Sequence, residues 1–364
     1  MAVAVYGLIA SVSIIGSGLG IAVNNGIDEL FAFASNPLTG LAIGILATVL
    51  TQSSSSTTSI VVGMVAGGLS IETAVPILIG ANLGTTLTST LVAFASSGSK
   101  DEFRRAFSAA SVHDVYNLLS VAIILPLELA FGILGRVSQW FAEYVTVNSS
   151  VASVFVSAGD SINAATAPPR IGLEMLLETL GEAGGVVMIG LGVVTIFVAI
   201  KSLAKILRSL LVGTAEKLFH RAVGHNSLAG VVAGMTMTAM VQSSSTTTSL
   251  TVPLAAADKF ALKQIYPFTV GANVGTTLTA LVAAFAFTGP ASTAALTAAS
   301  VHLFYNVFSA LVIFATPLRL IPLHGARALG RMGSKRTWYV VAWIVTVFVF
   351  APSILLLIGL NTSP

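Results

Sequence analysis

The sequence contains no cysteine and very few charged residues. Without cysteine, the chain has no disulfide bond, no thiolate metal site and no cysteine nucleophile. Only 9% of its 364 residues are charged, whereas 55% are hydrophobic, and the mean hydropathy is +0.93. Soluble domains carry about 25% charged residues. The composition therefore excludes an ordinary soluble domain and indicates a membrane protein.

Several uncharged runs are long enough to cross a bilayer. About 20 apolar helical residues span a hydrocarbon core about 30 Å thick. The runs Ala74–Ser99, Gln264–Leu318 and Trp338–Leu360 contain no acid, lysine or arginine. The apolar start, Met1–Val23, lacks the basic residues that open a cleavable signal, so it predicts a first span that is retained. The sequence thus predicts an all-α polytopic membrane protein.

Three sequence blocks recur in the same order, 189 to 191 residues apart. The pairs are TQSSSSTTS at 51–59 and VQSSSTTTS at 241–249, GANLGTTLT at 80–88 and GANVGTTLT at 271–279, and SVHDVYN at 111–117 and SVHLFYN at 300–306. Repeats at a constant offset indicate homologous structural units. We therefore expect a first repeat at 1–135, an extracellular or periplasmic linker at 136–183, a second repeat at 184–318, and a basic cytoplasmic segment with a final transmembrane helix at 319–364.

The polar run in each repeat predicts a re-entrant hairpin, at about 37–70 and about 226–257. Between Glu29 and Glu72 lie 42 uncharged residues, which as one helix would measure about 63 Å. The polar run divides them into arms of about 12 and 10 apolar residues, too short to cross alone. Because non-helical backbone at membrane depth needs protein or a water-filled cavity around it, both polar tips are expected to face the interior.

The distribution of basic residues predicts the orientation. Placing the basic loops in the cytoplasm leaves only Arg136 and Arg170 outside among the lysines and arginines. The first hairpin then enters from outside and the second from inside, so the repeats have inverted topology. Secondary transporters are built in this way, with their site near the midplane between broken helices. The same assignment puts the C-terminus outside.

The two Gln-Ser-Ser-Ser tips are the first candidate site. Their helix starts present free amides and a partial positive charge that suit an anion, and hydroxyls add donors without a fixed charge. Small polar residues also mediate helix packing, which is the alternative. We expect no basic side chain in the membrane core, so a bound cation such as Na⁺ is needed to offset the desolvation of the anion. The candidate residues are Gln52, Ser53, Ser54, Ser55, Gln242, Ser243, Ser244 and Ser245.

Asp114 is the most specific single candidate, because an acid inside a transmembrane span is functional by default. Its counterpart in the second repeat is Leu303, so its role belongs to one half only. The alternative is a structural ion pair with Arg104 or Arg105. The Gly-Ala-Asn-x-Gly-Thr-Thr blocks add further oxygens, for which ligand binding and helix packing both remain open. These residues are Asn82, Thr85, Thr86, Thr88 and Thr90 in the first repeat and Asn273, Thr276, Thr277 and Thr279 in the second.

These motifs, together with the segment DEFRRAFSAASVHD at 101–114, resemble the type II sodium-dependent inorganic phosphate cotransporter family, in a bacterial-type form. The resemblance implies secondary active uptake of inorganic phosphate with sodium as the coupling ion, no other cofactor, and a possible homodimer. It implies phosphate and sodium ligands at the two Gln-Ser-Ser-Ser tips, including Gln52, Gln242 and Ser243 for sodium. It also implies sodium ligands among the blocks above and net charge movement associated with Asp114.

Other functions are open on the residues alone. Sulfate, arsenate or an organic anion would suit the same hydroxyl-rich tips. A passive channel fits opposed hairpins less well than alternating access does. An intramembrane serine hydrolase is disfavoured, because the chain has no Gly-x-Ser-x-Gly elbow. We therefore expect a transporter rather than an enzyme. It is expected to lie in the lipid bilayer of a bacterial inner membrane and to bind no nucleic acid.

Overall fold

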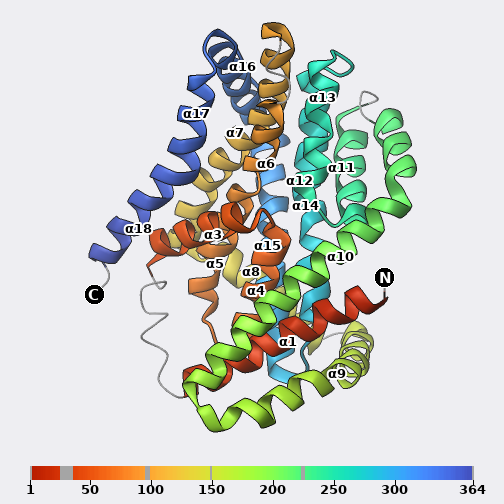
Figure 1. The fold of residues 1–364 in the computed structure, drawn as a ribbon, viewed down its shortest axis with the longest axis vertical. Helices are drawn as coiled ribbons and strands as arrows, with labels where there is room; N and C mark the ends of the chain where they lie inside the picture. Colours follow the sequence, from red (N-terminus) through yellow and green to blue (C-terminus); the bar gives the residue numbers. More distant parts are fainter. Residues whose placement is uncertain (1, 25–35, 95–98, 148–149, 223–225, 363–364) are drawn as a thin grey trace.

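The computed structural model describes residues 2–24, 36–94, 99–147, 150–222 and 226–362 (Figure 1). Every regular element within these ranges is helical. Residues 25–35 and 95–98 of the predicted first repeat, and 223–225 of the second, lie outside the described residues. Within the described ranges, six helical stretches are long and apolar enough to cross a membrane: Val3–Ala22, Ile71–Ala93, Lys100–Phe131, Glu182–Leu203, Gly289–Phe314 and Trp338–Thr362. The prediction of an all-α polytopic membrane protein is confirmed.

The elements of the first part of the chain are α1 (Ala2–Asn24), α3 (Pro37–Thr51), α4 (Ser54–Ala66), α5 (Ile71–Gly84), α6 (Leu87–Ala93), α7 (Lys100–Phe131) and α8 (Ile133–Thr146). Then follow α9 (Ser150–Leu177), α10 (Glu182–Ala222), α11 (Ser227–Val241), α12 (Ser244–Ser249), α13 (Thr251–Ala256), α14 (Leu262–Ala284) and α15 (Gly289–Ser309). The last are α16 (Leu320–Lys335), α17 (Trp338–Val345) and α18 (Ala351–Thr362). The described residues of the predicted linker at 136–183 are mainly helical.

Helices far apart in the sequence lie side by side. The first long helix, α1, packs along α10, while α15 packs on α8 and α16 on α7. Figure 1 places α13, α16 and the start of α7 at one end of the molecule, and α1 and α9 at the other. The main apolar core combines residues of α1, α4, α5, α14 and α15, among them Val12, Val62 and Ala299. Contacts between the two parts of the chain therefore build the centre of the protein.

Glycines allow two helix pairs to approach closely. A Cβ atom at Gly44 of α3 would overlap the carbonyl oxygen of Ile77 on α5, and one at Gly234 of α11 would overlap that of Phe268 on α14. These glycines are 190 residues apart in the sequence. Backbones can approach this closely in membrane proteins only through small residues. The α3–α5 and α11–α14 pairs thus use the same packing at matching positions.

Substituting Gly44 or Gly234 by alanine is expected to destabilise the protein by about 1–3 kcal/mol, because the added Cβ overpacks the contact. Thermal unfolding of the detergent-purified variants measures the change. Gly190 of α10 provides the control, since a Cβ there meets no atom within 4 Å. Alanine at that position removes the entropic cost of glycine and should leave stability equal or higher. Unfolding of Gly44→Ala at the wild-type temperature would contradict the close contact.

Candidate functional site

Both Gln-Ser-Ser-Ser motifs interrupt a helix in the same way. Helix α3 ends at Thr51 and α11 at Val241, and the glutamine that follows each has left-handed backbone geometry, with φ 54° and ψ 29° at Gln52 and φ 54° and ψ 31° at Gln242. Asp258 is the only other non-glycine residue with positive φ in the described part of the chain. This conformation costs about 1–2 kcal/mol for a residue with a Cβ, so it needs support from the surroundings.

The glutamine side chains supply that support. The Gln52 amide nitrogen donates to the Val49 carbonyl at 2.6 Å, and the Gln242 nitrogen donates to the Ala239 carbonyl at 2.6 Å. Each amide oxygen accepts a hydrogen bond from a threonine, Thr88 at 2.8 Å for Gln52 and Thr279 at 2.5 Å for Gln242. Each glutamine therefore connects the end of its helix to the last threonine of the Gly-Ala-Asn block in the same repeat.

The next residues start a new helix at each break. The hydroxyls of Ser53 and Ser243 accept from the third amide of the new helix, Ser56 N and Thr246 N, each at 3.2 Å. The first two amides of a helix have no partner within it, so they remain available as donors at each start. The side chains of Ser54, Ser55 and Ser244 are buried and those of Gln242, Ser243 and Ser245 are half-buried, whereas Gln52 is exposed.

Each new helix packs against the other part of the chain. Helix α4 contacts α14 and α15, and α12 contacts α6. The Ser89 hydroxyl of α6 lies 2.9 Å from the Thr248 hydroxyl of α12, and both are buried. The two hydroxyl-rich starts therefore lie at the boundary between the predicted repeats.

A buried network of side-chain amides and imidazoles crosses the same boundary. His113 Nε2 lies 2.6 Å from Asn273 Oδ1, and His302 Nε2 lies 3.3 Å from Asn82 Oδ1. Asn117 Oδ1 accepts from Asn273 at 2.8 Å and from Asn82 at 3.4 Å. The oxygens of Asn82 and Asn273, both predicted sodium ligands, thus accept or share hydrogen bonds with histidines of the opposite part.

Two other predicted sodium ligands occupy matching positions. Thr85 donates to the Ala81 carbonyl and Thr276 to the Ala272 carbonyl, each at 3.2 Å. Both side chains are buried. Because the hydroxyl proton points to a carbonyl in each case, the oxygen lone pairs remain free to bind a cation.

Asp114 is fully buried and lacks a basic partner among the described residues. Its Oδ2 accepts from Thr90 at 3.0 Å and from the Trp343 indole at 2.9 Å, while Oδ1 has no hydrogen bond. Thr86 also lies beside this carboxyl group, but its hydroxyl donates to the Leu83 carbonyl. A buried carboxylate oxygen without a donor suits a hard cation that takes oxygen ligands.

The structural alternative for Asp114 is wrong. Arg104 pairs with Asp101 at 3.3 Å, and Arg105 donates to the Ala256 carbonyl at 2.7 and 3.0 Å. Neither guanidinium group reaches Asp114, which lies about 13 Å further along α7 than Arg105 at the usual helical rise. Neither arginine therefore holds the carboxylate in a structural ion pair.

The structure gives roles to two residues outside the sodium and phosphate ligands that the resemblance implies. Thr88 binds Gln52, and its position in the first GTT block matches that of Thr279 in the second, a correspondence visible in the sequence. Trp343 comes from the last transmembrane helix, which has no counterpart in the repeats. No sequence pattern connects that indole to Asp114. Within the described residues no three His, Asp or Glu side chains form a metal cluster, so a cation here would bind mainly hydroxyl and carbonyl oxygens.

Comparison with known proteins identifies the family. The sequence profile of the Na⁺/Pi-cotransporter family matches residues 8–138 and 195–316. The chain is 30% identical to sodium-dependent phosphate transport protein 2A of Rattus norvegicus and 31% identical to that of Ovis aries, each over 96% of this chain. It is 29% identical to protein 2B of Homo sapiens over 87% of this chain. No solved structure matches the chain.

The matched regions contain both Gln-Ser-Ser-Ser motifs, both Gly-Ala-Asn blocks and Asp114. The chain spans 65% of the length of the two 2A relatives and 58% of the 2B relative. The expected family is confirmed on two separate stretches that each carry one set of motifs. The chain belongs to the Na⁺/Pi-cotransporter family.

Proposed function

We propose that this protein takes up inorganic phosphate by coupling it to inward sodium movement. The observation that carries the proposal is the pair of helix breaks at Gln52 and Gln242, which share backbone geometry, side-chain bracing and capped helix starts. Family membership and the names of the relatives, which are sodium-dependent phosphate transport proteins, support the same function.

We propose that the two halves are inverted-topology repeats, each with a re-entrant hairpin. The constant offset of the motifs and the matching glycine contacts at Gly44 and Gly234 support this arrangement. Alternating access would then rock one half against the other around a central site. Applying the positive-inside rule, the end that carries α13 and α16 faces the cytoplasm. The membrane would be the inner membrane of a bacterium, and the functional unit a homodimer.

Phosphate would bind between the two helix starts. Free amides and the positive ends of α4 and of α12 with its continuation α13 attract an anion, and the serine hydroxyls donate to its oxygens. The proposed ligands are Gln52, Ser53, Ser54, Ser55, Gln242, Ser243, Ser244 and Ser245. Dipoles and hydroxyls carry no full charge, so sodium binding beside them offsets the cost of removing phosphate from water.

Sodium would bind oxygens at the same boundary. Asp114 supplies the one full negative charge, through the Oδ1 atom that no protein donor occupies. The proposed ligands are Gln52, Asn82, Thr85, Thr90, Asp114, Gln242, Ser243, Asn273, Thr276 and Thr279. Because a carboxylate in the site lets an additional cation bind without an additional anion, transport would move net charge across the membrane.

Reconstitution into liposomes tests the function. We expect uptake of radiolabelled phosphate to require an inward sodium gradient and to persist in the presence of excess sulfate. A potassium gradient of the same size serves as the control. Sodium-dependent uptake that sulfate abolishes would point to a broader oxyanion transporter, and no uptake by folded protein would contradict the proposal.

Replacing Gln52 or Gln242 by glycine separates the two roles of the side chain. Glycine adopts φ 54° without strain, so the backbone break should persist while the amide is lost. We expect the phosphate concentration for half-maximal uptake to rise at least about tenfold, equivalent to about 1.4 kcal/mol. Gln139→Gly, at an exposed helical position, should leave this concentration unchanged. Unaltered phosphate affinity in both break variants would remove the proposed site.

Changing Asp114 to Asn should lower the charge moved per phosphate, because a cation no longer meets a carboxylate. Current and phosphate flux recorded together on reconstituted protein give this ratio. Trp343→Phe removes one donor to Oδ2 but keeps the carboxylate, so it should retain the charge ratio while shifting the sodium dependence. An unchanged charge ratio in a folded Asp114→Asn protein would show that Asp114 does not determine charge movement.

A further inference from the structure

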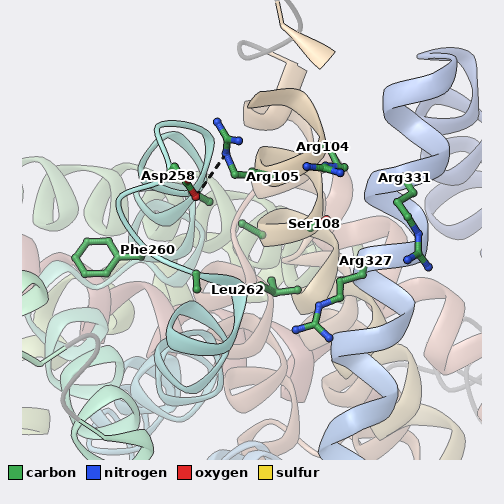
Figure 2. Close-up of a pocket in the computed structure, with 11 residues that line it drawn as sticks. Arg104, Arg105, Ser108, Asp258, Phe260, Leu262, Arg327 and Arg331 are labelled. Carbon is green, nitrogen blue, oxygen red and sulfur yellow. Dashed lines mark ion pairs between the residues drawn. The ribbon is translucent and has the colours of Figure 1, made fainter. Parts of the chain in front are cut away.

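Four arginines surround a cavity of about 360 Å³ at the end of the molecule that carries α13 and α16 (Figure 2). Helix α7 contributes two of them, α16 contributes two, and the turn between α13 and α14 closes the third side. We call this the arginine cavity. Its polar lining consists of Arg104, Arg105, Ser108, Asp258, Arg327 and Arg331.

Close packing of α7 against α16 places residues of both helices in the lining of the cavity. Arg104 and Ser108 are four residues apart on α7, and Arg327 and Arg331 are four apart on α16, so each pair lies on one helical face. At Gly330 the two helices approach so closely that a Cβ would overlap the Ser108 hydroxyl and lie 2.7 Å from the Arg104 carbonyl oxygen. Figure 2 shows the Arg327 side chain extending from α16 toward α7.

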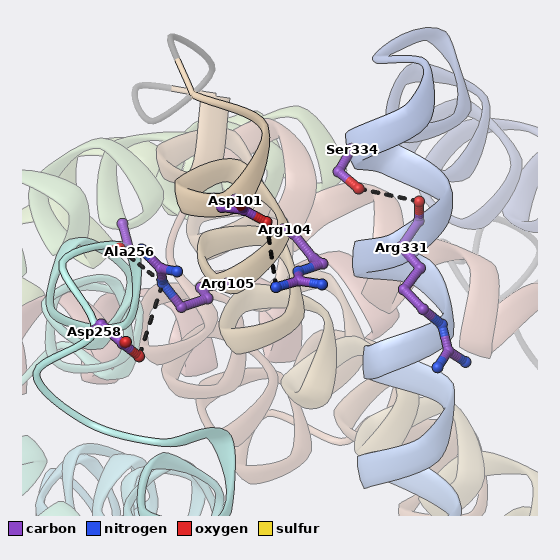
Figure 3. A network of polar contacts seen from close by, with 7 residues as sticks. All are labelled: Asp101, Arg104, Arg105, Ala256, Asp258, Arg331 and Ser334. Carbon is purple, nitrogen blue, oxygen red and sulfur yellow. Dashed lines mark hydrogen bonds and ion pairs between the residues drawn. The ribbon is translucent and has the colours of Figure 1, made fainter.

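The charges around the cavity are not balanced. Arg104 has a partner in Asp101 at 3.3 Å, outside the cavity lining, and Arg105 is 3.9 Å from Asp258 (Figure 3). The guanidinium groups of Arg327 and Arg331 have no ion pair or hydrogen bond within the described part of the chain. Four guanidinium groups against one carboxylate leave the lining with a net charge of +3.

Membrane topology explains why basic residues lie at this end of the molecule, but it does not explain why four arginines line one cavity. The positive-inside rule asks only that lysines and arginines lie on the cytoplasmic side, and like charges held close together repel one another. Guanidinium groups also match the oxygens of a phosphate group through paired N–H donors. A cleft lined by charges of one sign raises the local concentration of the opposite ion.

We propose that the arginine cavity binds a phosphate group, and specifically the inorganic phosphate that leaves the transport site toward the cytoplasm. The assignment rests on the proposed function. Helix α7 lines the cavity through Ser108 and the transport site through Asp114, six residues or about 9 Å further along the helix. The segment that follows the helix break at Gln242 also reaches the arginine cavity, since α12 continues through α13 to Asp258 in the cavity wall. Two elements of the proposed transport site therefore lead to the arginine cavity on the cytoplasmic side of that site.

Chemical protection tests binding without relying on transport. Phenylglyoxal modifies arginine side chains, and mass spectrometry reports the rate at each residue. In nanodiscs of pure phosphatidylcholine and in sodium-free buffer, we expect millimolar inorganic phosphate to slow modification of Arg327 and Arg331 at least about fivefold. Arg136, an exposed residue of α8 outside the cavity, is the internal control. Equal rates with and without phosphate would overturn the site.

A second arm separates the free ion from a lipid headgroup, which presents the same phosphate chemistry. Nanodiscs that contain phosphatidic acid are treated with phenylglyoxal in the absence of inorganic phosphate. Protection by inorganic phosphate in the phosphatidylcholine discs supports the proposal. Protection that appears only with phosphatidic acid would overturn it in favour of a lipid site.

The double variant Arg327→Gln/Arg331→Gln tests the link to transport. In liposomes we expect it to raise, at least about threefold, the phosphate concentration that half-saturates exchange from the cytoplasmic face, and to leave that from the other face unchanged. Lys335→Gln, which removes a charge from the same helix outside the cavity, is the matched control. Protected arginines with unchanged exchange would overturn the release role. Absence of phosphate transport by the wild-type protein would instead contradict the proposed function, and the protection result would stand by itself.

Discussion

A helix that ends within a bundle leaves peptide groups without partners in that helix, and the centre of this protein is organised around two such ends. Each break needs hydrogen bonds from nearby side chains, since an unpaired buried polar group costs roughly 1–3 kcal/mol. Gln52 and Gln242 meet part of this need by binding the last turn of one helix, and Ser53 and Ser243 meet it by capping the next. The amides left over at the new helix starts are donors already oriented for an anion.

The same requirement explains why the boundary between the two parts of the chain is polar. Asn117 joins the asparagines of the two Gly-Ala-Asn blocks, and each block pairs with a histidine from the other part. Such a network holds the two parts in register, because any displacement leaves several buried groups without partners. Asp114 stands next to this arrangement with one free carboxylate oxygen, a position that favours a cation over a fixed structural bond.

The arginine cavity is connected to the proposed transport site by two segments of the chain. Both α7 and the α12–α13 segment run from the proposed transport site to the cavity wall. Charge changes along this path from a single buried carboxylate to a lining with net positive charge. A basic cavity at the end of the molecule would hold the anion outside the low-dielectric region, where its desolvation is less costly.

Much of the fold could be predicted from the sequence because composition and repetition report directly on the solvent. Scarce charge and runs of about 20 apolar residues require transmembrane helices in any arrangement, and the motif pairs at a constant offset identify Gln52 and Gln242 as equivalent positions. The polar runs also contain both helix breaks, although most of each run is helical, since α4 begins at Ser54 and α12 at Ser244. These features depend on local sequence alone.

Only the tertiary structure decided which side chains meet. Trp343 and Asp114 are 229 residues apart, and the indole comes from a helix outside the repeats. Arg104 and Arg331 line one cavity because Gly330 lets α16 approach α7, and no periodicity in either segment predicts that approach. The sequence by itself determined the membrane class, the family motifs and the helix breaks, since these follow from local composition and order. The partners of Asp114 and the arginine cavity depend on how the helices pack, because contact between distant segments is set by the shapes of both surfaces together.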